Sequence, residues 1–169
     1  NIPVDELTAT PILTDYFKSK ELSNLVVVAV DVGISKRARD VAESLNAPLA
    51  IIEKRRLGNN DSAETLNVIG EVSGKIALTF DDEILTGGTI VNAAQAIKNK
   101  GAKDVHVYIT HAVLSGSAVE RIEKSKIKKL ITTDTIDNSK KIRMSKKIEI
   151  ISIAPMISEA MKRIANSTS

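Results

Sequence analysis

The 169-residue sequence contains no cysteine and no tryptophan, and aromatic residues make up only 2% of it. The lack of cysteine excludes disulfides and thiolate metal sites. With so few aromatic side chains, the core must be built from isoleucine, valine, leucine and alanine, which suits buried parallel strands covered by helices. Basic residues are not interleaved with aromatic ones that could stack bases, so we expect no nucleic-acid partner.

Long apolar runs and a signal-peptide pattern are also lacking, so we expect no membrane association and a cytoplasmic protein. What is present is a composition with 43% apolar and 27% charged residues, enough for a core and a polar surface. The net charge of +3 suits an anionic small molecule. The length is close to that of one ordinary domain, and we expect a single domain over residues 1–169.

Short apolar runs alternate with amphipathic stretches along the chain. Strands are predicted at 25–30, 49–52, 76–80, 105–109, 130–132 and 148–151. Helices are predicted at 35–45, 90–100, 117–125 and 156–164, and the polar stretches 55–64 and 137–147 are predicted to be mobile. This alternation predicts an α/β fold with a mostly parallel twisted sheet flanked by helices. In such sheets ligands bind beyond the carboxyl ends of the strands.

An acidic pair and a glycine-rich turn follow the strand predicted at 76–80. Asp81 and Asp82 can accept hydrogen bonds from a vicinal diol or hold a divalent cation through water. Residues 86–89 (Thr-Gly-Gly-Thr) can bring backbone N–H groups close to an anion, and the following helix adds its own N-terminal N–H groups. A diol-binding group beside a phosphate cradle describes a ribose 5-phosphate site. The alternative is an acidic β-turn with a flexible glycine pair.

Two further groups follow predicted strands. Asp31 comes after the strand at 25–30 and is a candidate for a metal or ligand contact, or for the N-cap of the next helix. Lys54, Arg55 and Arg56 run into the polar stretch after the strand at 49–52. Beside a phosphate cradle, cations on a loop can neutralise charge that develops in phosphoryl transfer. Otherwise they form a solvated charged loop.

The acidic pair followed by Thr-Gly-Gly-Thr resembles the phosphoribosyl-diphosphate loop of type I phosphoribosyltransferases and ribose-phosphate pyrophosphokinases. Segments along nearly the whole chain favour the pyrophosphokinases, in the order of that family. They are residues 2–9, Asp31 with 36–39, 46–56, 68–72, 110–116, 133–136 and 152–155. The chain is therefore identified as resembling the C-terminal half of a two-domain ribose-phosphate pyrophosphokinase, with a type I phosphoribosyltransferase-like fold.

The resemblance implies a reaction in which ribose 5-phosphate and MgATP give phosphoribosyl diphosphate and AMP. It implies that Lys54 and Arg56 stabilise the transferring diphosphate, that Asp81 and Asp82 organise the ribose hydroxyls and magnesium, and that Asp31 is linked to Mg²⁺. The 5-phosphate loop is implied to consist of Leu85, Thr86, Gly87, Gly88 and Thr89.

Two departures from the family pattern matter. Many members carry an aspartate where this chain has Leu85, so the loop lacks a carboxylate near the sugar. The first domain of the family, which supplies a magnesium-binding histidine and adenine contacts, has no counterpart in this chain. We therefore expect a missing N-terminal domain or sister subunit as partner, a homo-oligomer, and little or no activity from the chain alone. The alternatives are a nucleobase phosphoribosyltransferase and a non-catalytic pyrophosphokinase-associated subunit.

Overall fold

The computed structural model describes residue 4 and residues 6–56 and 64–166. Its centre is a seven-stranded sheet with the strand order β3-β2-β1-β4-β5-β6-β7. All neighbouring strands are parallel except β2 and β3, which pair antiparallel. The strands are β1 (Leu25–Ala29), β2 (Leu49–Arg56), β3 (Glu64–Ile69), β4 (Ile76–Ile84), β5 (Asp104–Ala112), β6 (Lys129–Thr133) and β7 (Ile148–Ile151).

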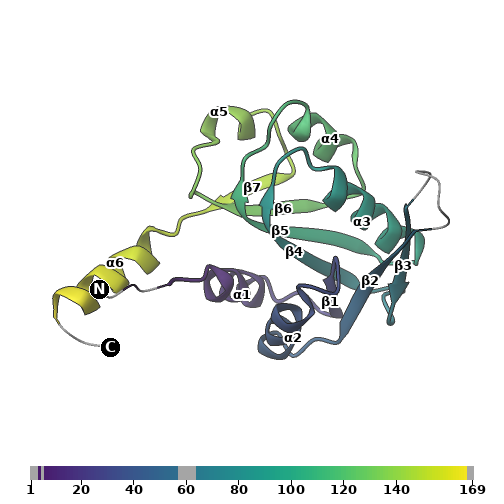
Figure 1. The fold of residues 1–169 in the computed structure, drawn as a ribbon, viewed down its shortest axis with the longest axis horizontal. Helices are drawn as coiled ribbons and strands as arrows, with labels where there is room; N and C mark the ends of the chain where they lie inside the picture. The colour runs from purple at the N-terminus through teal and green to yellow at the C-terminus, as the bar shows by residue number, and fades with distance from the viewer. Residues whose placement is uncertain (1–3, 5, 57–63, 167–169) are drawn as a thin grey trace.

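Helices cover both faces of the sheet (Figure 1). The helices on the sheet are α1 (Thr10–Ser19), α2 (Ser35–Ser44), α3 (Gly88–Asn99), α4 (Ala118–Lys124) and α5 (Ser139–Ile142), and a further helix, α6 (Ala154–Ala165), follows β7. The predicted α/β fold with a mostly parallel sheet flanked by helices is confirmed.

The hydrophobic core consists of two layers, one on each side of the sheet. On one side Val26 and Val28 pack with α3 and α4, and on the other Val27 and Ala29 pack with α1 and α2. Alternate side chains of a strand point to opposite faces, so β1, whose central valines are fully buried, contributes to both layers. The continuous apolar run in this part of the sequence reflects that position between two helical layers.

Several elements differ from those predicted. β4 continues to Ile84 and β2 continues to Arg56, because each gains backbone hydrogen bonds from a neighbouring strand. Two elements were not predicted: α1, which packs on the core through Leu13, Phe17 and the half-buried Tyr16, and the antiparallel strand β3. The stretch 137–147, predicted to be mobile, contains the short helix α5.

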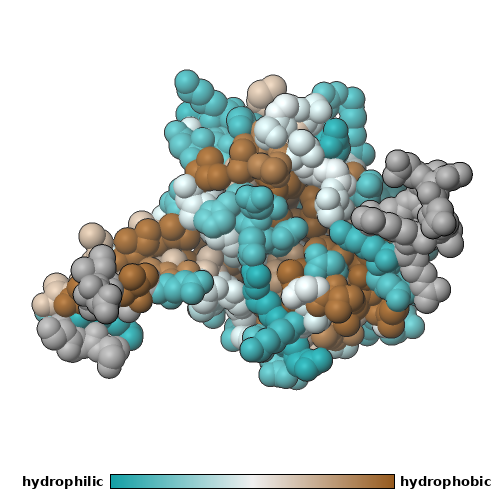
Figure 2. Space-filling view, viewed as in Figure 1, coloured by the Kyte–Doolittle hydropathy of each residue, from teal (hydrophilic) through white to brown (hydrophobic). Residues whose placement is uncertain are grey.

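The last helix, α6, projects from the body of the structure (Figure 1). None of its residues is buried, and its exposed apolar side chains Ile157, Met161 and Ile164 lie at helical spacing. Hydrophobic atoms are visible along this projecting helix in Figure 2. In the part of the chain that the structure describes, no helix combines the length and the apolar character needed to cross a membrane.

Candidate functional site

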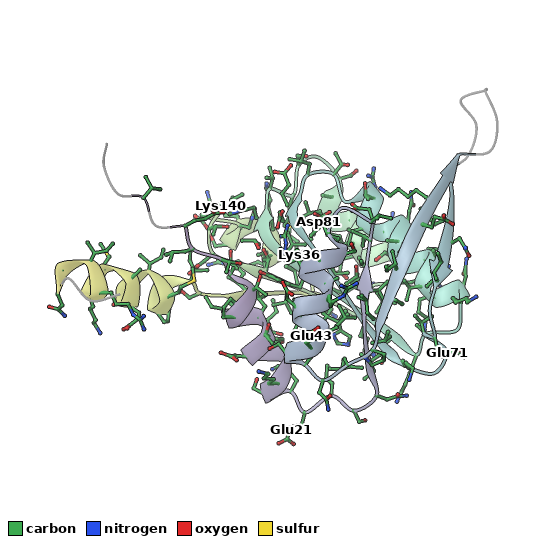
Figure 3. The ribbon with its side chains drawn as sticks, turned by 60° about the horizontal axis from the view of Figure 1, so that its bottom comes forward. Glu21, Lys36, Glu43, Glu71, Asp81 and Lys140 are labelled. Carbon is green, nitrogen blue, oxygen red and sulfur yellow. The ribbon has the colours of Figure 1, made fainter. Side chains whose placement is uncertain are left out.

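Three acidic residues gather at the edge of the sheet where β1 and β4 end. Asp31 follows β1. Asp81 and Asp82 were predicted to follow a strand, but they belong to the last residues of β4 itself. Since β1 and β4 are parallel neighbours, their carboxyl ends meet at one edge. Figure 3 shows Asp81 well apart from Glu71, which lies between β3 and β4.

The two adjacent acids have different partners. Arg37 of α2 donates hydrogen bonds from Nη1 and Nη2 to the two carboxylate oxygens of Asp82, and the Nη2–Oδ2 distance is 3.0 Å. These hydrogen bonds lower the pKa of Asp82. The planar guanidinium matches a carboxylate in geometry and charge. Asp82 is therefore held as an anion in a fixed orientation.

Asp81 is the acid that faces the pocket described below. Its Oδ1 accepts the backbone N–H of Asp82 at 2.8 Å. Burial raises the pKa of Asp81, and the charges of Asp82 and Asp31 add to the rise, against the opposite effect of the backbone hydrogen bond. Because the ionised form of Asp81 is disfavoured in this way, a bound cation or a hydroxyl donor would stabilise that form strongly.

The glycine-rich segment forms the wall of a pocket. Residues 85–87 bend between β4 and α3, and Gly87 has a φ of +77°, in the left-handed region that glycine adopts without steric cost. The helix α3 begins at Gly88, so its unpaired N-terminal N–H groups lie at the pocket. The pocket has a volume of about 350 Å³ and is lined by Asp81, Glu83, Ile84, Leu85, Thr86, Gly87, Gly88, Thr89 and Ile90.

Two backbone carbonyls of this loop are held by residues far along the chain. The N–H of Ser115 donates to the carbonyl oxygen of Leu85 at 2.8 Å, and Nη1 of Arg121 donates to that of Thr86 at 2.9 Å. The side chain of Leu85 is 50% exposed. Arg37 and Arg121 were not predicted as site residues, because only the fold brings Arg37 to Asp82 and Arg121 to Thr86.

Lys54 and Arg56 lie on a strand, not on a loop as predicted. Lys54 pairs with Leu66 and Arg56 pairs with Glu64 across the antiparallel β2–β3 ladder. The Lys54 side chain is exposed, whereas the Arg56 side chain and residues 57–63 of the predicted mobile stretch lie outside the described part. A run of charged residues gives no alternating pattern, so the strand was not recognisable in the sequence. Roles for these cations in catalysis remain predictions.

Asp31 has one clear local partner, since its Oδ1 accepts the N–H of Ile34 at 3.1 Å before α2 begins. Within the described residues, no group of three or more histidine, cysteine or acidic side chains is arranged to hold a metal ion. The charge of Asp31 is nevertheless close enough to contribute to the raised pKa of Asp81. Mg²⁺ commonly takes one or two carboxylates and completes its shell with water and substrate phosphates. Two carboxylates of this kind are chemically suited to a divalent cation.

The sheet order, the acidic strand end and the glycine-rich turn into α3 define the class of the protein as a type I phosphoribosyltransferase-like α/β domain. A family model described as the phosphoribosyl synthetase-associated domain matches residues 59–169. The chain belongs to this family.

Similar proteins agree with this assignment. The chain is 48% identical to the ribose-phosphate pyrophosphokinase of Bacillus caldolyticus, over 97% of this chain and 51% of that protein. It is 50% identical to the pyrophosphokinase of Caldanaerobacter subterraneus subsp. tengcongensis, over 97% of this chain and 52% of that protein. The chain therefore spans about half the length of the curated relatives that it matches.

Solved structures extend the comparison to the fold. The crystal structure of phosphoribosylpyrophosphate synthetase from Mycobacterium smegmatis superposes with a TM-score of 0.87 at 33% identity, covering 98% of this chain and 53% of that one. An APRTase from Giardia lamblia, at 16% identity, has a TM-score of 0.57 and covers 73% of this chain and 75% of that one, which shows a shared fold alone. The family resemblance stated from the sequence is confirmed.

Proposed function

We propose that this chain binds ribose 5-phosphate in the pocket between β4 and α3, as the sugar-phosphate half of a ribose-phosphate pyrophosphokinase. The observation that carries the proposal is that one pocket is lined both by Asp81 and by residues 86–89 at the start of α3. A carboxylate accepts hydrogen bonds from ribose hydroxyls, and N–H groups at a glycine-rich helix start receive a phosphate. The name shared by the curated relatives supports this substrate.

In the proposed reaction, the C1 hydroxyl oxygen of ribose 5-phosphate attacks the β-phosphorus of ATP. The bond from that phosphorus to the oxygen of the α-phosphate breaks, AMP leaves, and the hydroxyl proton is released. A bound Mg²⁺ would supply positive charge that neutralises the phosphate oxygens. The protein's part is mainly to position the groups and to stabilise charge. Asp81 and Asp82 orient the ribose through its hydroxyls. Asp31 and Asp81 would hold the cation. Lys54 and Arg56 attract the negatively charged diphosphate.

The remaining ATP contacts come, in this proposal, from a companion domain or a sister subunit within a homo-oligomer. The relatives' greater length supports it, because about half of each lies outside the region that this chain matches. The isolated chain then binds the sugar phosphate but does not turn over ATP. This half-enzyme arrangement makes binding and catalysis separable in an experiment.

Calorimetric titration tests the binding site directly. We expect the isolated chain to bind ribose 5-phosphate more tightly than ribose, which lacks the anion, and more tightly than inorganic phosphate, which lacks the hydroxyls. Replacing Thr89 by valine keeps the shape but removes one pocket hydroxyl and should weaken binding several-fold, by roughly the value of one hydrogen bond. Equal affinity for ribose and ribose 5-phosphate would exclude a phosphate cradle in this pocket.

The reaction is tested by measuring AMP formed from ATP and ribose 5-phosphate. We expect none from the chain alone, and activity when the N-terminal half of the Bacillus caldolyticus relative is added or fused. Robust turnover by the chain alone would show that no companion is needed. Diphosphate release that depends on an added nucleobase would instead identify a phosphoribosyltransferase, and binding without turnover in every combination would favour a non-catalytic subunit.

A further inference from the structure

The peptide bond between Thr86 and Gly87 is held in one orientation from outside the loop. The Thr86 carbonyl accepts a hydrogen bond from Arg121 Nη1 at 2.9 Å, and among the hydrogen bonds of the described residues this is its one donor. No cis peptide occurs in the described residues. In a trans peptide the C=O and the N–H point in opposite directions. The N–H of Gly87 therefore points away from Arg121.

Arg121 does not line the loop pocket. The pocket is lined by the loop itself and by Asp81. Arg121 instead lines a groove of about 440 Å³ between α3 and α4, together with Val91, Gln95 and Lys124 among others. An N–H that points away from this groove is directed to the pocket side of the loop.

The helix that carries Arg121 is firmly anchored behind the loop. Ala118 and Ile122 of α4 are fully buried in the core. A Cβ atom built on Gly87 would be 3.8 Å from Ile122 Cγ1, and one built on Gly88 would be 3.4 Å from Arg121 Nη1. The exposed Arg121 side chain thus reaches the back of the loop from a helix that is anchored in the core.

We propose that Arg121 is a positioning residue that turns the Gly87 N–H toward the phosphate of the bound sugar phosphate. This inference rests on the proposed function. A glycine peptide rotates at little steric cost, so without Arg121 the peptide is free to turn its carbonyl oxygen, with its partial negative charge, into the pocket. One donor would then be replaced by a repulsive acceptor at the position where the phosphate binds.

Two substitutions of Arg121 and one matched control test this role. Arg121→Met keeps the length of the side chain but removes every donor, and Arg121→Lys restores a single cationic donor that can reach the same carbonyl. Lys124→Met removes an equal charge from the next turn of α4 and from the same groove, but Lys124 pairs with Glu120 rather than with the loop. Thermal unfolding of all three verifies that each chain is folded.

Ribose 5-phosphate affinity is measured by calorimetry, and the Gly87 amide is followed by NMR during the titration. We expect Arg121→Met to bind roughly tenfold more weakly, and Arg121→Lys to recover to within roughly threefold of wild type. The exposed, solvent-screened Lys124 should matter less than roughly twofold. In the wild type the Gly87 amide proton should shift strongly downfield as ligand binds, and in Arg121→Met this shift should be lost.

The outcomes separate this inference from the function on which it rests. If the wild-type chain fails to bind ribose 5-phosphate, the proposed function falls and the role of Arg121 falls with it. If the wild type binds and Arg121→Met binds equally well, or Lys124→Met weakens binding as much as Arg121→Met, the positioning role alone is overturned. A wild-type Gly87 amide that does not respond to the ligand overturns it as well, even where a variant fails to fold.

Discussion

Arg37 pairs with Asp82 and not with Asp81, so two adjacent acids of identical chemistry have different partners and oppositely shifted pKa values. Both oxygens of Asp82 accept hydrogen bonds from the guanidinium, while Asp81 faces the pocket. The side chains of this ion pair are 41% and 56% exposed. Pairs so accessible to water contribute little to stability. The main consequence of the pair is therefore the orientation of Asp82 beside the ligand.

Replacing Arg37 by glutamine should release Asp82. We expect ribose 5-phosphate affinity to fall roughly tenfold, because the acceptor loses its fixed orientation, while the free energy of unfolding changes by less than about 1 kcal/mol. Calorimetry and chemical denaturation measure the two quantities. Arg39→Gln, which removes the same charge from the same helix, is the control, and equal losses in both variants would reduce the effect to net charge.

Asp81→Asn should increase stability at neutral pH while weakening ligand binding. The folded-state pKa of Asp81 is raised above its ordinary value of 3.8, so its ionised form costs stability at every pH above that raised pKa. Removing the carboxyl should raise the Tm by a few degrees at pH 7. This advantage should decline as the pH falls through the raised pKa, and it should vanish below 3.8.

The control for this prediction is the neighbouring Asp82→Asn, which should behave in the opposite way. The pKa of Asp82 is lowered by Arg37, so its charge stabilises the folded state above the ordinary value of 3.8. The variant should be less stable at pH 7, and its deficit should shrink only as the pH falls from 3.8 through the lowered pKa. If the stability of both variants, relative to wild type, changed with pH in the same direction, the opposite pKa shifts of Asp81 and Asp82 would be contradicted.

Gly88→Val should weaken sugar-phosphate binding. A Cβ atom on Gly88 would already lie 3.4 Å from Arg121 Nη1 and 4.0 Å from Thr86 Oγ1, so the two methyl groups of valine would crowd the loop and the guanidinium behind it. We expect a loss of more than roughly tenfold in affinity, measured by calorimetry. Gly74→Ala is the control, because Gly74 is remote from the pocket: it has a φ of +68° and open space around it, and should lose stability without losing affinity. Full binding by Gly88→Val would mean that the phosphate lies elsewhere.

Leu85→Asp should tighten the binding of ribose 5-phosphate. It introduces the carboxylate that many proteins of the pyrophosphokinase pattern carry at this position. The Leu85 side chain lines the pocket and is half exposed, so its loss removes little from the core. We expect a gain of roughly threefold to tenfold, the value of one added hydrogen bond to a charged acceptor. Leu85→Asn separates the effect of charge from that of polarity, and weaker binding by the aspartate variant would show that the leucine suits a different ligand.

Much of the fold and of the loop could be predicted from local patterns. Buried parallel strands are continuous apolar runs, and the glycine pair before α3 marks a tight turn, so β1, β4 and the pocket wall were recognisable in the sequence. The edge strand β3 and the charged end of β2 were not. Among the described side chains of β3, only Leu66 and Val68 pack on the core, which is too short an alternation to mark a strand, and the charged end of β2 is held by its pairing with β3.

What the sequence by itself determined is the chemistry available: carboxylates at Asp81 and Asp82, a glycine turn at 86–89, and the family to which these belong. The tertiary structure alone decided which partner each of those groups has. The strand order brings Asp31 beside Asp81, α2 delivers Arg37 to Asp82, and α4 places Arg121 behind Thr86. Such pairings depend on distances between residues far apart in the chain, which no local pattern encodes. Only the packing of helices on the sheet fixes which acid is paired with an arginine and in which direction a peptide N–H points.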